Sequence, residues 1–296
     1  MSSITKPDAA ASTPRFSFSW QQRQRAARIA LYLVLTLLAL LIILPLLWMI
    51  STSFKPKSEW FLPQIYWIPK TFTWANYEKI LDNPSLPIAR WFFNSVMVSS
   101  LVTALILAVD SVAAYAYARM EFPGKRMLFS LLLATLFLPG VMFLVPNFLT
   151  VAQLGLLNNY AGVILPGLAG VFGVFFMRQF FESLPKELEE AAYIDGATRV
   201  QTFLYIALPL AKPALATLGI ITFLASWNDF LWPLLILKDR ALITLPPGLR
   251  TLQGAYTSEY GQMMAGAVIT SLPVLLLYVL LQRYIVESVQ TTGLKG

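Results

Sequence analysis

The apolar positions of this chain gather into six long runs, with shorter polar connections between them. A helix that crosses a lipid bilayer needs about 20 consecutive, mostly apolar residues. The runs that approach or exceed this length are 29–50, 91–118, 128–151, 160–177, 213–237 and 260–282. Because these runs are continuous and do not alternate between apolar and polar residues, they favour helices over the strands of a membrane barrel. The pattern predicts an all-α integral membrane protein with six transmembrane helices.

The first apolar run is expected to remain in the protein. Residues 29–50 are uncharged and longer than the apolar core of a signal peptide, which has about 7–15 residues. No pattern of small residues typical of a cleavage site follows Ile50. We therefore expect a polar tail over residues 1–27 and a transmembrane domain over residues 28–296.

The composition excludes a soluble enzyme. Apolar residues make up 57% of the 296 positions and charged residues 12%, and the mean hydropathy is +0.65. Soluble domains are about 45–50% apolar and about 25% charged. The chain has neither Cys nor His, which removes thiolate nucleophiles, Ser-His-Asp triads and zinc or haem held by these residues. We expect no catalytic site, no cofactor and no metal site.

The net charge of +7 follows the connections between the runs. Fourteen of the 22 Lys and Arg residues lie in the N-terminal tail, the second and fourth connections and the C-terminal end, and eight lie in the other connections. Because Lys and Arg concentrate on the cytoplasmic side of membrane proteins, both termini are predicted to be cytoplasmic. Residues 51–90 and 238–259 are then external. The topology explains the positive charge, so no nucleic-acid partner is expected.

The fourth connection, residues 178–212, has the pattern of two short helices. Pro185 suits the first turn of a helix, and Gly196 lies where a left-handed cap would end it. A second helix is expected from Thr198 to Pro209. A charged helix-turn-helix beneath the membrane is suited to docking on another protein, but a solvated loop with ordinary caps fits the same pattern equally well.

The spacing of residues in this loop resembles the EAA signature of permease subunits in bacterial ABC importers. The matching positions are Glu190-Ala191-Ala192, then Gly196, then Ile206-Ala207-Leu208-Pro209. The resemblance implies a coupling loop, about 182–212, whose helix sits in a cleft on a separate ATP-hydrolysing subunit. The residues it assigns to ATPase coupling are Glu190, Ala191, Ala192, Gly196, Ile206, Leu208 and Pro209.

Further segments are similar to the shorter permease of the maltose-type carbohydrate importers. They are 114–119 with 122–125, the Trp-Asn-Asp-Phe segment 227–230, residues 245–246 with 256–265 in the external loop (about 238–259), and the C-terminal segments 282–284 and 293–296. The likeness covers roughly residues 28–296. At Glu287-Ser288 the chain departs from the family, which more often has a glycine before its tail.

This resemblance implies a type I ABC importer architecture in a bacterial inner membrane, with the chain forming half of a translocation path. The implied partners are a second, non-identical permease, a dimer of ATP-binding subunits, an external solute-binding protein and a carbohydrate substrate. Gly124-Lys125 lacks the other positions of a phosphate-binding loop. ATP is therefore expected to be hydrolysed on a partner subunit.

Two ionisable residues, Asp110 and Asp229, fall inside the predicted spans, where a charge is costly and points to function. Asp110 is followed by the small Ser111, so a plain helix-helix contact is an alternative. Asp229 lies beside Asn228 and near Trp232; carboxylate and amide oxygens accept from sugar hydroxyls, and an aromatic face covers an apolar ring face. Asn228, Asp229 and Trp232 are the candidate substrate path, and a structural acid in an apolar helix is the alternative.

Two other classes of protein fit the sequence less well. An ion-coupled secondary transporter would carry several charges near the bilayer centre, often with an internal repeat, and the sequence has two such acids and no evident repeat. An intramembrane enzyme is disfavoured, because the sequence lacks Cys and His as catalytic groups. Pro139, Pro146 and Pro166 are expected to kink helices three and four, either beside a path or simply for packing.

Overall fold

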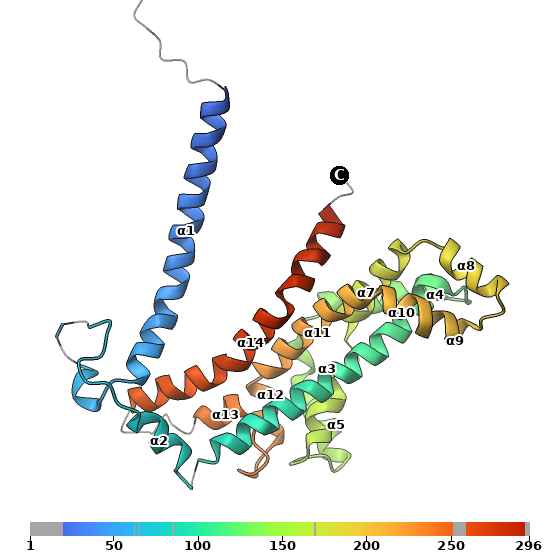
Figure 1. Ribbon diagram of the computed structural model, residues 1–296. Helices are drawn as coiled ribbons and strands as arrows, with labels where there is room; N and C mark the ends of the chain where they lie inside the picture. Colours follow the sequence, from blue (N-terminus) through green and yellow to red (C-terminus); the bar gives the residue numbers. More distant parts are fainter. Residues whose placement is uncertain are drawn as a thin grey trace, which may run out of the picture. The chain divides into compact units, whose positions relative to one another are not determined.

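The computed structural model describes residues 20–61, 63–64, 66–84, 86–168, 170–250 and 259–293. Within these ranges every regular element is a helix, as the sequence predicts, and the chain divides into two compact units that meet between Trp48 and Met49. Figure 1 shows the helices with their labels. Three of them are long and apolar enough to span a membrane by themselves: α1 (Trp20–Ser53), α3 (Ile88–Arg119) and α14 (Tyr260–Gly293).

Helix α1 begins in the first unit and ends in the second. Its membrane-spanning part runs over Ala27–Ser53 with a single proline, Pro45, inside it. The side chains of residues 27–47 are exposed, although almost all of them are apolar from Ile29 onward. An exposed apolar helix of this length is suited to a lipid environment.

The third predicted span, 128–151, is not one continuous helix. The structure has α4 (Lys125–Ala134) and the 3₁₀ turn η2 (Thr135–Phe137), followed by η3 (Gly140–Phe143) and α5 (Leu144–Gln153). The two halves meet at 98°, and Pro139 lies at the break with an extended backbone. Pro139 therefore interrupts the helix as predicted, whereas Pro146 lies in the first turn of α5, where no hydrogen-bond donor is required.

The fourth and fifth predicted spans are also broken. Residues 160–177 are divided among α6 (Tyr160–Ile164), the 3₁₀ turn η4 (Leu165–Gly167), which contains Pro166, and α7 (Val171–Ser183). Residues 213–237 form α11 (Lys212–Trp227) and α12 (Leu231–Ile236), so the expected continuous helix is interrupted at 228–230. Pro233 in the first turn of α12 supplies a physical reason, because it cannot donate a hydrogen bond to the preceding turn.

The loop between α7 and α11 is helical, as predicted. It contains α8 (Glu187–Ile194), α9 (Arg199–Thr202), one π-helical turn η5 (Phe203–Ala207) and α10 (Leu208–Leu210). The stretch from α9 to α10 meets α11 at 76°. The second helix of the loop thus starts one residue after Thr198, close to the expected position.

Helix α3 is the centre of the second unit, because α7 and α11 both pack against it, and α11 in turn packs against α14 (Figure 1). One apolar core on these helices contains Ala114, Met177, Phe181 and Leu218, all buried. Another core joins α3 to α6 and α12 and contains Val98, Val163 and Ile236. The cavity and the loop described below are both attached to α3.

The segments outside the predicted spans are held to the helix ends by hydrogen bonds. They include the 3₁₀ turn η1 (Lys57–Glu59), α2 (Ala75–Leu81) and α13 (Leu245–Leu249). The Nε1 of Trp91 donates to the carbonyl of Arg240 (2.7 Å), and the Nδ2 of Asn94 donates to those of Ala241 and Ile243 (2.9 Å each). Because Trp91 and Asn94 lie in α3, the segment before α13 is fixed against this helix.

Candidate functional site

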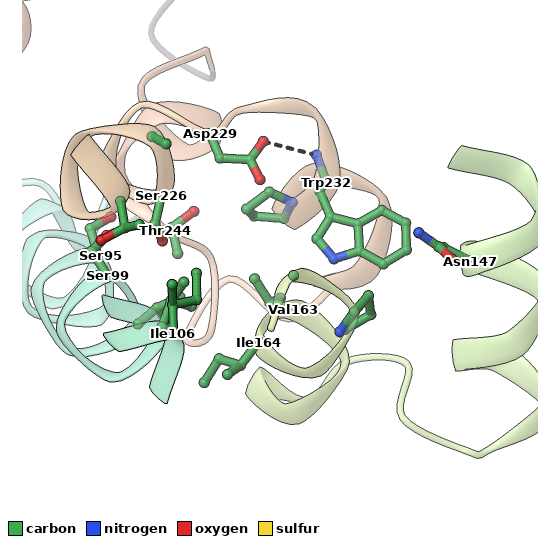
Figure 2. Close-up of a pocket in the computed structure, with 17 residues that line it drawn as sticks. Ser95, Ser99, Ile106, Asn147, Val163, Ile164, Ser226, Asp229, Trp232 and Thr244 are labelled. Carbon is green, nitrogen blue, oxygen red and sulfur yellow. Dashed lines mark hydrogen bonds between the residues drawn. The ribbon is translucent and has the colours of Figure 1, made fainter. Parts of the chain in front are cut away.

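A cavity of about 340 Å³ opens between α3, α6, α11 and α12 (Figure 2). It lies at the lower end of the range for small-molecule sites, about 300–1,000 Å³. Its polar lining consists of Ser95, Ser99, Asn147, Thr222, Ser226, Asp229, Trp232 and Thr244. The other residues of the lining, such as Ile106 and Val163, are apolar. An apolar cavity with several converging polar groups is typical of a ligand site.

Two of the three predicted path residues line this cavity, and the broken helix is what places them there. Asp229 lies in the 228–230 break between α11 and α12, and its Oδ1 accepts from the backbone N–H of Trp232 (3.3 Å). The indole Nε1 of Trp232 donates to the carbonyl of Gly162 (3.2 Å) in α6. Figure 2 shows the Trp232 ring between Asp229 and Asn147. The position of the ring is thereby fixed by two elements.

The third predicted path residue, Asn228, lies elsewhere. Its side chain is exposed and donates to the carbonyl of Leu224 (2.9 Å) in the preceding turn. Asn228 is not among the residues that line the cavity. The expected grouping assumed a continuous helix, and the break after Trp227 turns Asp229 and Asn228 in different directions.

The hydroxyl groups of the cavity were not singled out from the sequence. Ser95 and Ser99 come from α3 and Thr244 from the segment before α13, and all three are nearly fully buried. The Oγ of Ser95 accepts from the backbone N–H of Leu245 (2.8 Å). The hydroxyls of Ser99 and Thr244 have no hydrogen-bond partner among the described residues. Only the tertiary structure brings residues so far apart in the chain together, so no local motif reveals them.

The cytoplasmic loop of the prediction has the caps that its sequence indicates. Gly196 has a φ of +83°, which favours glycine strongly, and ends α8. Thr198 and Gln201 form a reciprocal capping box at the start of α9. These caps fix a sharp turn between the two helices of the loop.

The residues assigned to coupling are divided between the surface and the interior of this loop. Glu190, Ala191, Gly196 and Pro209 are exposed, Ile206 and Leu208 are half-buried, and Ala192 is buried. Large apolar side chains are exposed beside them: Leu188, Tyr193, Ile194, Val200, Leu204 and Tyr205. Exposed apolar side chains gathered on one loop are typical of surfaces that contact another protein or a membrane.

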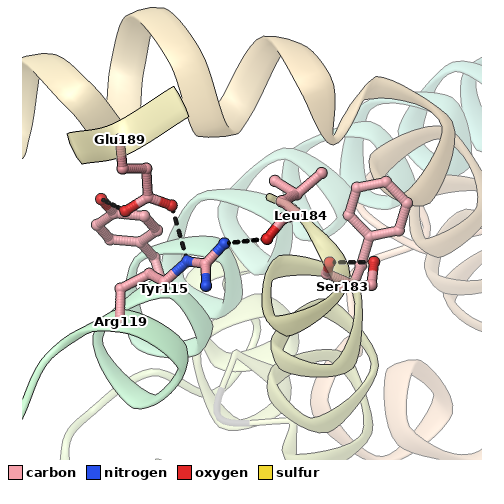
Figure 3. A network of polar contacts seen from close by, with 6 residues as sticks. Tyr115, Arg119, Ser183, Leu184 and Glu189 are labelled. Atoms are coloured by element: carbon pink, nitrogen blue, oxygen red, sulfur yellow. Dashed lines mark hydrogen bonds and ion pairs between the residues drawn. The ribbon is translucent and has the colours of Figure 1, made fainter. Parts of the chain in front are cut away.

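Glu189, the residue before Glu190, points into the protein and not toward the surface. Glu189 is buried, and its carboxylate accepts from the Nε of Arg119 (2.7 Å) and the hydroxyl of Tyr115 (3.1 Å). Arg119 also donates from Nη2 to the carbonyl of Leu184 (2.7 Å). Figure 3 shows this network at the last turns of α3. The loop is thus attached to the same helix that supplies Ser95 and Ser99 to the cavity.

Asp110, the other intramembrane acid, lies between α3 and α7 and away from the cavity. It is 1% exposed, and neither carboxylate oxygen has a hydrogen-bond partner among the described residues. A methyl group at Gly173 of α7 would overlap its Oδ2. Asp110 thus occupies a close helix-helix approach, one of the two alternatives for this residue.

The apolar helices and the polar cavity between them are features of a membrane permease. The model of the family "Binding-protein-dependent transport system inner membrane component" matches residues 75–291. The chain belongs to this family.

Named relatives and a solved structure agree with this assignment. The arabinooligosaccharides transport system permease protein AraQ of Halalkalibacterium halodurans is 39% identical over 261 residues, which cover 88% of this chain and 93% of that protein. The trehalose/maltose transport system permease protein MalG of Thermococcus litoralis is 32% identical and covers 91% and 97%. A chain of a bacterial ABC transporter for import of the acidic polysaccharide alginate has a TM-score of 0.78 at 26% identity, covering 92% and 99%.

Proposed function

We propose that this chain is the transmembrane subunit of an ATP-driven carbohydrate importer, in which it forms half of the translocation path. The relatives named for arabinooligosaccharides, trehalose and maltose, and the neighbour in alginate import, support a carbohydrate substrate. The observation that carries the proposal is the position of α3. Ser95 and Ser99 of this helix line the polar cavity, and Arg119 at its other end holds the coupling loop.

The assembly we propose places residues 28–296 in a bacterial inner membrane as the permease domain, with the 1–27 tail and both termini in the cytoplasm. A second, non-identical permease completes the path, and an external solute-binding protein meets the loop at about 238–259. A dimer of ATP-binding subunits binds the coupling loop at about 182–212. This chain then has no catalytic site of its own.

Coupling is assigned to the exposed face of the loop. Glu190 presents a carboxylate to polar or basic groups of the ATPase, and the half-buried Ile206 and Leu208 of the same loop add apolar surface. Gly196 makes the turn that presents α8, because its φ of +83° is strained for any residue with a side chain. The exposed Ala191 and Pro209 complete this docking element, and the buried Ala192 belongs to its interior.

The path is assigned to the cavity that contains Asp229 and Trp232. The carboxylate of Asp229 accepts hydrogen bonds from sugar hydroxyls, and the face of Trp232 covers the apolar side of a sugar ring. Asn228 is left out of this role, because its amide is bound to the carbonyl of Leu224.

Two variants separate the coupling loop from the path in one experiment. Glu190→Lys reverses the charge on the docking face and is expected to reach the membrane but to lose co-purification with the ATPase. Asp229→Ala is expected to retain the ATPase and to lose uptake of arabinotriose, trehalose or maltose by cells. Membrane abundance of each variant, measured by quantitative blotting, controls for failed insertion.

A third variant, Glu121→Lys, is the matched control, since Glu121 is an exposed acid on another predicted cytoplasmic connection. It is expected to co-purify with the ATPase and to take up sugar normally. If Glu190→Lys also binds the ATPase and transports normally, the loop is not the coupling element. Normal uptake of every sugar by Asp229→Ala would make Asp229 a structural acid.

A further inference from the structure

We propose that the cavity is a subsite for an uncharged, hydroxyl-rich ring and that it disfavours anionic ligands. This inference rests on the proposed function and narrows its substrate class. The named relatives leave the class open, because they include permeases for neutral sugars and a structural neighbour that imports an acidic polysaccharide.

The unpartnered hydroxyls of Ser99 and Thr244 are the first observation. Each lines the cavity, and each oxygen is buried without a hydrogen-bond partner among the described residues. A buried polar group without a partner is costly, so natural proteins pair such groups with protein, water or ligand. A hydroxyl both donates and accepts, which matches the hydroxyls of a sugar and does not require a charged ligand. Because both oxygens have almost no accessible surface, they reach such a ligand only when their side chains rotate toward the cavity.

The charge of the cavity is the second observation. Among the described residues, Asp229 is the only ionisable one in the lining, and no Lys or Arg of this part of the chain lines the cavity. Among the ion pairs of the described residues none includes Asp229. Sites for carboxylates, sulfonates and phosphates usually supply an Arg or Lys. This cavity offers an acid in their place, so a uronate or a sugar phosphate would meet repulsion without a counter-charge.

The position of Trp232 is the third observation. Figure 2 shows its indole at the side of the cavity opposite Ser95, Ser99 and Thr244, with Asp229 between them. The bond from its Nε1 to the carbonyl of Gly162 fixes the ring. A sugar ring in the cavity has hydroxyl groups on one side and an aromatic side chain on the other, an arrangement that needs no charge.

Charge-selective thiol labelling tests the electrostatics of the cavity without knowledge of the sugar. The chain has no native Cys, and Ser226 lines the cavity, so Ser226→Cys gives a single thiol there. The purified complex with its ATPase is treated with a neutral, a cationic and an anionic methanethiosulfonate reagent, with and without ATP. The rates are divided by those for free cysteine.

We expect the neutral reagent to react in at least one nucleotide state, and the cationic reagent to react about fivefold faster than the anionic one. A fivefold ratio is the order expected for one uncompensated charge within a Debye length. In Ser226→Cys with Asp229→Asn, the ratio should return to about one. The double variant is the matched control, because it differs from Ser226→Cys only in the removal of the Asp229 charge.

Three results would overturn the proposal. They are equal rates or an anionic preference in Ser226→Cys, a cationic preference that survives Asp229→Asn, and no reaction with the neutral reagent in either state, which would show a cavity closed to ligands. None of them affects co-purification with the ATPase or loss of coupling in Glu190→Lys, so failure of this inference is distinct from failure of the proposed function.

Discussion

At Gly173 the backbone of α7 comes so close to Asp110 of α3 that a methyl group has no room beside the carboxylate. Both residues lie in the packed seam between these helices, next to the core that contains Ala114 and Met177. Since packed interiors tolerate little extra volume, the close contact between α3 and α7 requires a glycine at position 173.

Gly173→Ala is therefore expected to destabilise the protein by about 1–3 kcal/mol, the cost of overpacking a core. The measurement is the thermal unfolding midpoint of the purified protein in detergent. Gly140→Ala is the matched control, because a Cβ there meets nothing within 4 Å. If the overlap with Asp110 is the cause, Gly173→Ala combined with Asp110→Ala regains most of the lost stability. Equal midpoints for Gly173→Ala and Gly140→Ala would contradict this reading of the seam.

Among the helices, α3 and α8 are joined by the buried ion pair between Arg119 and Glu189, whose side chains are 7% and 8% exposed. Removal of one partner from a buried pair leaves the other charge without compensation, which costs about 3–5 kcal/mol. The attachment of the coupling loop to α3 therefore depends on both residues, together with the bond from Arg119 to the carbonyl of Leu184.

Arg119→Ala is expected to lower the unfolding midpoint strongly and to abolish sugar uptake, because Glu189 becomes an unpaired buried charge. The reversed pair, Arg119→Glu with Glu189→Arg, should recover part of both losses. Glu121→Ala removes an ion pair with Lys125 in which Glu121 is 91% exposed, and should change little. An effect of Arg119→Ala no greater than that of Glu121→Ala would show that the buried pair does not hold the loop.

For the whole molecule, the distribution of Lys and Arg predicts an orientation in the membrane. The absence of native Cys makes this testable with single cysteines at Ser183, at the start of the coupling loop, and at Ser258, in the predicted external loop. A membrane-impermeant maleimide applied to intact cells should label Ser258→Cys and leave Ser183→Cys unmodified until the membrane is opened. Labelling of Ser183→Cys alone in intact cells would reverse the topology. Position 258 lies outside the described residues.

Local patterns determined much of this protein before any tertiary contact was considered. The apolar runs gave the helical class, because their length matches a bilayer and their continuity excludes alternating strands. The cap of α8 at Gly196 and the start of a second helix near Thr198 were also readable, since both depend on a few neighbouring residues. The motif in the loop indicated the family that the comparisons show.

Only the tertiary structure decided which residues meet. The break at 228–230 divided an expected continuous helix and separated Asn228 from Asp229 and Trp232. The partners of the cavity and of the loop come from segments far apart in the chain: Ser99 with Thr244, and Arg119 with Glu189. Periodicity reports which residues share a face of one helix, but not which faces of different helices pack together, because that depends on side-chain fit and on buried polar groups finding partners.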